Sequence, residues 1–261
     1  MVIDASEGNL YDIKKEFPSV RWIYFHNKKN KKITIPEQRN LGLKKAKGNI
    51  ITFIDANCVP DKNWLIELIK PISDEAESIV AGSIKSIGGK TIWDVEEERI
   101  SSKKYLGEAS TMNMAFKKEI IKKVGFFDEK FNYGSDMDFT WRITQEAYKI
   151  RRNKNAVIYH DWGNLKQEIK RAFRYGEARV GLYKKHPGRW KNLFGYDMVT
   201  LIYPLYIIFS PLTFLWPYYP LLILAPIIKN IKRQPLKVVF INLIFGFGIL
   251  KELFFLKKWN Q

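Results

Sequence analysis

The stretch "RNLGLKKAKGNIITFIDANCVPD", residues 39–61, decides the fold of this chain. It begins inside an expected helix, which opens on Pro36 and ends at Gly48, and continues into an apolar strand over 49–55. Asp55 ends that strand, and Asn57 follows in a polar turn. A strand that delivers two oxygen-bearing side chains at its carboxyl end predicts a ligand site at one edge of a sheet.

Strands and helices alternate on both sides of this stretch. We expect strands at 1–4, 20–27, 78–86 and 156–162, and helices at 10–17, 63–72, 118–127 and 136–148. This alternation predicts an α/β sandwich around a mostly parallel sheet. Asp4, Asp55 and His160 each end an expected strand, which would bring them to one edge. The alternative is a turn-forming role for the two Asp residues and a structural role for His160.

The composition excludes several classes of protein. The chain has 261 residues and a net charge of +17, and hydrophobic residues make up 46% of it, so a disordered chain is excluded. One cysteine excludes an intrachain disulfide framework. The basic excess favours nucleic acid, phosphorylated small molecules or anionic membrane as partners. No apolar signal segment opens the sequence, which predicts a cytosolic compartment for the N-terminal two-thirds.

The distribution of charge selects the membrane over nucleic acid. Residues 164–191 hold nine Lys and Arg against two Glu, whereas 198–228 contain no charged residue and five prolines. A basic segment beside a long apolar run is typical of membrane attachment. We expect 198–228 to enter the bilayer as a bent hairpin; a single kinked crossing and a soluble helix pair are the alternatives. No nucleic-acid partner is expected, because no recognition motif is present.

Three regions follow from these patterns. We expect a catalytic domain over 1–165, a basic juxtamembrane segment over 166–197 and membrane-associated helices over 198–261. The tendency of basic flanks to stay inside places the catalytic domain on the cytoplasmic side of the cell membrane.

The pair Asp55 and Asn57 predicts a binding site for a divalent cation. Hard divalent ions such as Mg²⁺ and Mn²⁺ prefer oxygen ligands and bridge them to phosphates. An acid-X-acid turn at a strand end would hold a nucleotide diphosphate through its metal, and here an amide takes the second position.

Two blocks together identify a family. The stretch 39–61 and the stretch "STMNMAFKKEIIKKVGFFDEKFNYGSDMDFTWRI", residues 110–143, resemble the two conserved blocks of family-two inverting glycosyltransferases with the GT-A fold. They occur in the family's order and cover most of residues 1–165. The resemblance implies a nucleotide-diphospho-sugar transferase, a Rossmann-like sandwich, here followed by a hydrophobic helical membrane region.

The resemblance also implies roles for residues on the nucleotide side. Asp4 would hydrogen-bond the base, most often uracil, and Arg39 would lie beside the base and the diphosphate. Asp55 would contact the ribose and the metal, Asn57 would occupy the main metal-ligand position, and His160 would supply a further metal ligand. The cofactor would be Mg²⁺ or Mn²⁺, and the donor a UDP-sugar.

On the acceptor side, the resemblance assigns the general base to Asp136, which would take the proton of the attacking hydroxyl. Asn113 would face the acceptor or the diphosphate, with a packing role as the alternative. Trp141 and Arg142 lie just beyond the base and would shape the acceptor cleft. A carboxylate at a helix N-terminus is the alternative for Asp136.

Arg171 and Arg174 are the candidates for binding the diphosphate. A guanidinium can bind phosphate oxygens bidentately, and both arginines lie in the basic stretch. The alternative is a patch that binds anionic lipid.

The sequence departs from the family pattern in three places. Asn57 replaces an acid, Ser135 replaces the Glu that usually precedes the base, and Met1 stands where the family pattern has a further strand and helix before "VID". The third departure indicates a truncated gene product, a start-site error or a sheet that lacks a central strand. We therefore expect an N-terminally truncated, membrane-associated inverting glycosyltransferase that acts on a lipid-linked or membrane-near glycan. The alternative is a catalytically silent homologue that binds nucleotide sugar or a partner protein.

Overall fold

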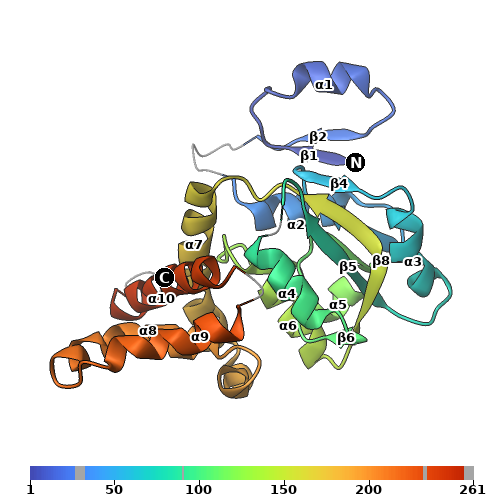
Figure 1. Ribbon diagram of the computed structural model, residues 1–261. Helices are drawn as coiled ribbons and strands as arrows, with labels where there is room; N and C mark the ends of the chain where they lie inside the picture. The colour runs from blue at the N-terminus through green and yellow to red at the C-terminus, as the bar shows by residue number, and fades with distance from the viewer. Residues whose placement is uncertain (27–32, 90, 232–233, 256–261) are drawn as a thin grey trace. The chain divides into compact units, whose positions relative to one another are not determined.

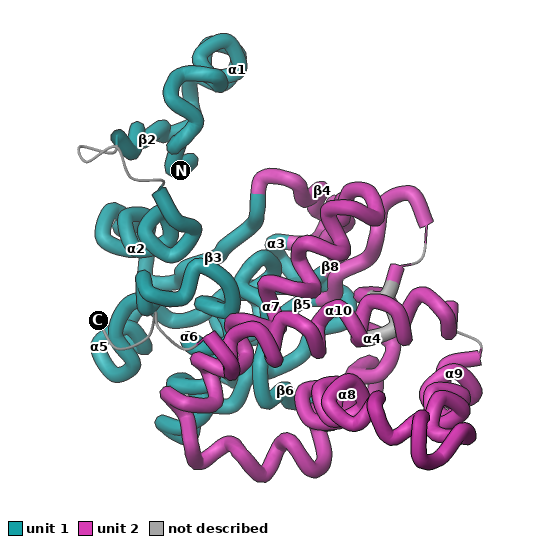
Figure 2. Tube along the Cα trace, turned by 90° about the vertical axis from the view of Figure 1, so that its left-hand side faces the viewer, with its two compact units in different colours: residues 1–55, 65–82, 104–156 teal, residues 56–64, 83–103, 157–261 magenta. Residues whose placement is uncertain are grey.

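The computed structural model describes residues 1–26, 33–89, 91–231 and 234–255. Residues 27–32 lie outside this part, and with them the end of the strand expected at 20–27. The chain divides into two compact units, and each unit consists of several separate segments of the sequence (Figure 2). Unit 1 contains residues 1–55, 65–82 and 104–156, and unit 2 contains residues 56–64, 83–103 and 157–261.

Short strands and helices alternate through unit 1, as the sequence predicts (Figure 1). They are β1 (Val2–Asp4), α1 (Tyr11–Glu16), β2 (Trp22–Tyr24), α2 (Ile35–Lys45), β3 (Ile50–Ile54), α3 (Trp64–Ser73), the first part of β5 (Ile79–Ser86), β6 (Tyr105–Leu106), β7 (Asn113–Lys117), α5 (Ile120–Val124), α6 (Ser135–Gln145) and the first part of β8 (Ile150–His160). Of these, β6 and β7 are not among the predicted strands.

Helices dominate unit 2. It contains β4 (Cys58–Pro60), the last residues of β5 and β8, α4 (Ile92–Ile100), α7 (Leu165–Lys185), η1 (Pro187–Phe194), α8 (Val199–Ile208), η2 (Ser210–Phe214), η3 (Tyr219–Ile223), α9 (Leu224–Lys229) and α10 (Pro235–Phe254).

The sheet differs from the mostly parallel arrangement that the alternation predicts. β1 and β2 form a separate parallel pair, and the six-stranded sheet has the order β3-β7-β5-β8-β4, with β6 on β8. β7 runs antiparallel to both β3 and β5, and β4 and β6 run antiparallel to β8. The prediction was wrong because it missed β7, a five-residue strand that enters between β3 and β5 from the opposite direction.

A cluster of phenylalanines forms the centre of unit 1. Phe116 and Phe139 are completely buried, and their ring centroids lie 5.5 Å apart. Phe127 stacks on Phe139 at 4.4 Å and meets Phe53 of β3 edge-on at 5.8 Å. These contacts tie β3 and β7 to α6 and to the turn that follows α5, so the elements that carry the candidate site share one core.

In unit 2, α7 packs closely along α10. A Cβ atom at Gly176 would collide with the backbone of Phe245, and one at Gly248 with the backbone of Phe173, so glycine permits the close approach. Two ion pairs join the same helices, Lys237 with Glu168 at 2.8 Å and Lys251 with Glu177 at 2.5 Å.

The apolar run 198–228 folds differently from the expected hairpin. It is divided among α8, η2, η3 and α9, and prolines begin or interrupt these short elements. Within the described ranges, we find no helix with both the length and the apolar character that a bilayer crossing requires. The spanning hairpin and the kinked crossing are therefore not supported.

Candidate functional site

Helix α2 positions the arginine that the site is built around. Thr34 and Glu37 form a capping box at its start, because the Thr34 hydroxyl accepts from the Glu37 amide and the Glu37 carboxylate accepts from the Thr34 amide. One turn later, Arg39 is largely buried. Its Nη2 lies 3.3 Å from Oδ1 of Asp55, at the end of β3, and its guanidinium lies over the ring of Phe127.

Asp136 lies in the first turn of α6, as the sequence predicts. Gly134, at φ +77°, turns the chain into this helix, and Oδ1 of Asp136 accepts a hydrogen bond from the Met137 amide at 3.0 Å. Burial raises the pKa of Asp136; the Arg39 charge opposes this rise and the Asp55 charge adds to it. Arg39, Asp55 and Asp136 thus influence one another, and unit 1 brings these three predicted residues together.

Asp4 lies in the small β1–β2 sheet, which packs on α2. The side chain is buried, and its Oδ1 accepts from the Ser6 amide at 2.8 Å. Its Oδ2 is buried and has no hydrogen-bond partner among the described residues. A buried carboxylate oxygen of this kind suits an N–H group of a ligand, which agrees with the predicted contact to the base.

The predicted metal ligands Asn57 and His160 both belong to unit 2. β4 pairs with the end of β8, so that Cys58 lies opposite His160. Nδ2 of Asn57 donates to the Asp161 carbonyl at 3.1 Å, which leaves Oδ1 as the atom that can coordinate a cation. The buried His160 ring lies 4.0 Å from the ring of Trp162.

The metal site itself stays a prediction. No group of three or more His, Cys, Asp and Glu side chains gathers to hold an ion in the described part of the chain. Asp55 and Asn57 do supply oxygen atoms, the donors that Mg²⁺ and Mn²⁺ prefer.

Arg171 and Arg174 lie on α7, which begins with a capping box at Asn164. Arg171 donates from Nη2 to the Trp162 carbonyl at 3.0 Å, and its guanidinium lies over the Trp162 ring. Its Nη1 is buried and makes no hydrogen bond within the described residues. Arg174 pairs with Glu177 at 2.8 Å. Trp162 was missed by the sequence analysis, although it follows His160 by two residues.

The three remaining candidates make contacts inside unit 1. The register of β3 and β7 puts Asn113 beside Ile54, and its Nδ2 donates to the Ala156 carbonyl at 2.9 Å. Trp141 is buried and donates from Nε1 to Glu108 at 2.7 Å. Arg142 pairs with Asp138 and donates to carbonyls at the end of α5. These contacts agree with packing roles, and contact with an acceptor stays a prediction. Glu108 carried no signal in the sequence.

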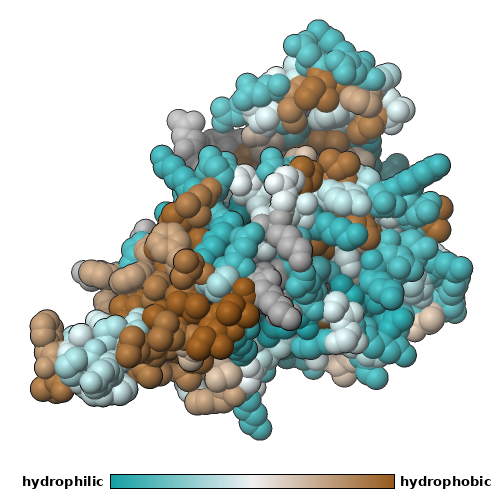
Figure 3. All heavy atoms as spheres, in the orientation of Figure 1, coloured by the Kyte–Doolittle hydropathy of each residue, from teal (hydrophilic) through white to brown (hydrophobic). Residues whose placement is uncertain are grey.

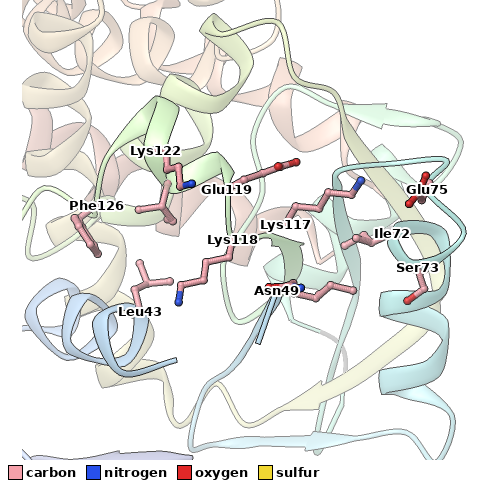
Figure 4. A pocket seen from close by; sticks show the side chains of 12 residues that line it. Leu43, Asn49, Ile72, Ser73, Glu75, Lys117, Lys118, Glu119, Lys122 and Phe126 are labelled. Atoms are coloured by element: carbon pink, nitrogen blue, oxygen red, sulfur yellow. The ribbon is translucent and has the colours of Figure 1, made fainter. Parts of the chain in front are cut away.

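A pocket lies at the other end of β3 (Figure 4). Its volume is about 620 Å³, and Asn49 and Ile50, at the start of β3, line it together with Lys117 and Lys118. Lys118 donates to the Ala46 carbonyl at the end of α2. Since Asp55 follows the opposite end of β3, this pocket is separate from the Arg39–Asp55–Asp136 group.

The family is shown by sequence comparison. The family model "Glycosyl transferase family 2" matches residues 1–135, which is just over half of the chain and ends at the first residue of α6. The chain therefore belongs to glycosyl transferase family 2, a family of glycosyltransferases.

Individual relatives agree with this assignment. The chain is 23% identical over 154 residues to the glycosyltransferase AglE of Haloferax volcanii, where the match covers 56% of this chain and 50% of that protein. It is 27% identical over 267 residues to the dolichyl N-acetyl-α-D-glucosaminyl phosphate 3-β-D-2,3-diacetamido-2,3-dideoxy-β-D-glucuronosyltransferase of Methanococcus voltae. This match covers 89% of this chain and 79% of that protein. The chain thus spans only half the length of AglE.

A solved structure supports the fold. The mannosyltransferase PcManGT of Pyrobaculum calidifontis, determined with GDP-Man and Mn²⁺, superposes with a TM-score of 0.70 at 16% identity, covering 97% of this chain and 76% of that one. The predicted α/β fold of the GT-A type is confirmed at this level.

Proposed function

We propose that this protein is a membrane-associated inverting glycosyltransferase. It moves a sugar from a nucleotide-diphosphate donor, a UDP-sugar in our proposal, to a lipid-linked or membrane-near glycan. The catalytic residues lie on the cytoplasmic side of the cell membrane.

The observation that carries this proposal is the grouping of Arg39, Asp55 and Asp136. Asp136 takes the proton from the acceptor hydroxyl as that oxygen attacks the anomeric carbon, and the bond from this carbon to the diphosphate oxygen breaks. Because burial raises the pKa of Asp136, its carboxylate is a stronger base than an exposed one. Arg39 provides the positive charge that favours the ionised form.

Each unit, taken by itself, offers atoms that suit the donor. Asp4 Oδ2 is an acceptor for the base, and Arg171 Nη1 is a donor for a phosphate oxygen. Asp55 and Asn57 would hold Mg²⁺ or Mn²⁺, and such an ion would supply charge that stabilises the diphosphate leaving group. The Mn²⁺ and GDP-Man in PcManGT support a divalent ion and a nucleotide sugar for this chain too.

A lipid-linked acceptor is supported by the Methanococcus voltae relative, whose name gives a dolichyl phosphate compound as its acceptor. Membrane association is supported by the apolar surface of unit 2 (Figure 3). Phe214 is 92% exposed and Leu215 is 84% exposed, with further apolar side chains along η2, η3 and α9. A contiguous exposed apolar surface of this kind marks a membrane or protein contact, and the basic stretch 164–191 favours an anionic bilayer surface.

The proposal is tested by donor turnover. The full chain is incubated with anionic liposomes, Mn²⁺, each of several radiolabelled UDP- and GDP-sugars and a polyisoprenyl phosphate or its glycosylated form. We expect transfer from one donor, with the configuration at the anomeric carbon inverted, and loss of transfer when the metal is chelated. Retained configuration, or metal-independent transfer at the same rate, would contradict the proposal.

The second candidate function is a catalytically silent homologue that binds nucleotide sugar or a partner protein. Asn57 and Ser135, which stand where the family pattern has acids, favour it. Nucleotide-sugar binding without transfer or hydrolysis of any donor would select this alternative.

A further inference from the structure

An apolar groove lies within unit 2, between α8 and the segment formed by η3 and α9. Its volume is about 350 Å³. Ile202 and Leu205 of α8 form one wall, with Phe209 just beyond that helix, and Leu222, Ile223 and Pro226 form the other. Tyr206 and Tyr219 also line it and stack on one another with ring centroids 5.3 Å apart, which holds the two walls in place.

The lining offers few hydrogen bonds to a ligand. None of the lining residues is charged, and the three tyrosine hydroxyls are already engaged. Tyr219 donates to the Tyr206 carbonyl at 2.7 Å, Tyr206 donates to the Pro220 carbonyl at 3.3 Å, and Tyr203 hydrogen-bonds Asn242. A sugar or a nucleotide would leave its polar groups unsatisfied here, which is unfavourable. The groove therefore suits a hydrocarbon.

The groove is open along the apolar surface of unit 2. Ile202, Leu205, Phe209 and Leu222 line it and are each at least 40% exposed. The exposed side chains of Phe214 and Leu215 lie on the chain between its two walls. A hydrocarbon chain can therefore pass from a bilayer into the groove without crossing a polar rim.

We propose that this groove binds the hydrocarbon chain of the acceptor, a long-chain lipid phosphate such as a polyisoprenyl phosphate. This proposal rests on the lipid-linked acceptor of the proposed function. It further names the residues that bind the lipid part of that acceptor. Two observations favour the acceptor over bulk lipid. The groove is preformed, since the Tyr206–Tyr219 stack holds it, and surface attachment needs no such groove. The basic stretch 164–191 on the same unit complements the lipid's phosphate.

Two matched pairs of residues allow a direct test. Ile202 and Ile208 both lie on α8 and are 45% and 44% exposed, but Ile202 lines the groove and Ile208 does not. Leu222 and Leu221 of η3 are 49% and 54% exposed, but Leu222 lines the groove and Leu221 does not. Ile202→Trp and Leu222→Trp fill the groove. Ile208→Trp and Leu221→Trp add the same ring to the same surface and serve as controls.

The full protein is kept in detergent micelles and titrated with a long-chain polyisoprenyl phosphate or with its water-soluble short-chain analogue. The rise in melting temperature that each ligand causes measures its binding. Displacing two methylene groups from the groove corresponds to roughly tenfold weaker binding. We expect Ile202→Trp and Leu222→Trp to bind the long chain about tenfold or more weakly. The two controls should match the wild type, and all five proteins should bind the short analogue equally.

Several results would overturn the proposal. If a groove variant and its control lose affinity alike, the lipid contacts the surface and not the groove. If the wild type binds the long and the short ligand equally well, the hydrocarbon chain of the ligand is not recognised. Unligated melting temperatures check the fold of each variant. Because binding is read without a sugar donor, failure of the groove is distinguishable from failure of glycosyl transfer, which would appear as absent turnover with both acceptors.

Discussion

The phenylalanine core of unit 1 and the apolar run of unit 2 contain the same kinds of side chain in opposite environments. Phe116 and Phe139 are fully buried against other rings, whereas Phe214 and Leu215 are almost fully exposed. In unit 1 the apolar contacts position Arg39, Asp55 and Asp136. In unit 2, Phe214 and Leu215 remain exposed, and we propose that a membrane covers them. The difference teaches that hydrophobic composition predicts burial only where the chain itself can cover the surface.

The largest effect that we expect is on catalysis in unit 1. Asp136→Asn removes the base while it keeps the size of the side chain, so transfer should fall by about 10²–10⁴-fold. Initial rates with the active donor measure the loss. Asp74→Asn, an exposed acid near the end of α3, is the control and should keep the wild-type rate. An Asp136→Asn protein with unchanged rate would remove Asp136 from the mechanism.

The next effect tests the comparison directly. Phe139→Ala leaves a cavity between Phe116 and Phe127 and should lower the free energy of unfolding by about 3–5 kcal/mol. Phe214→Ala removes an exposed ring and should change it by less than about 0.5 kcal/mol. Urea unfolding measures both. Flotation with anionic liposomes should show the reverse order, with weaker binding for Phe214→Ala. Equal losses of stability would break the comparison.

A smaller effect concerns pH and stability. Because burial raises the pKa of Asp136 in the folded protein, its ionised form is less favourable there than in the unfolded chain. The wild type therefore loses stability as pH rises through this raised pKa. Asp136→Asn avoids that loss, so its melting temperature should exceed the wild type's by a few degrees at neutral pH. The gain should shrink in acid, where the wild-type carboxyl is neutral. A gain that is constant with pH would contradict this account.

The smallest effect compares matched helix starts, one in each unit. Thr34→Ala removes the capping box of α2, and Asn164→Ala removes that of α7. Each should cost about 1 kcal/mol. Amide hydrogen exchange should show faster exchange in α2 for the first and in α7 for the second. If either change loosens both helices equally, the two units unfold together and the division between them has no energetic meaning.

Much of the fold was predictable from local patterns. The helix beginning near Pro36, the strand ending at Asp55 and the helix that carries Asp136 lie where apolar spacing and capping signals indicate. The sequence also predicted that Asp55 and Asp136 lie at one site, because each belongs to one of the two blocks that resemble the family. The antiparallel β7 was missed, since a five-residue strand is too short for its pattern to be distinguished from that of a buried helix segment.

The sequence by itself determined the family, the alternation of strands and helices, and the residue types at the site. The tertiary structure decided which of these residues meet. Arg39 and Asp55 are 16 positions apart, and their contact depends on how α2 packs beside β3. The tertiary structure also decided the shape of the apolar run, which forms short elements and a groove. Local propensity acts over a few residues, whereas contacts and burial depend on every segment that competes for the same core.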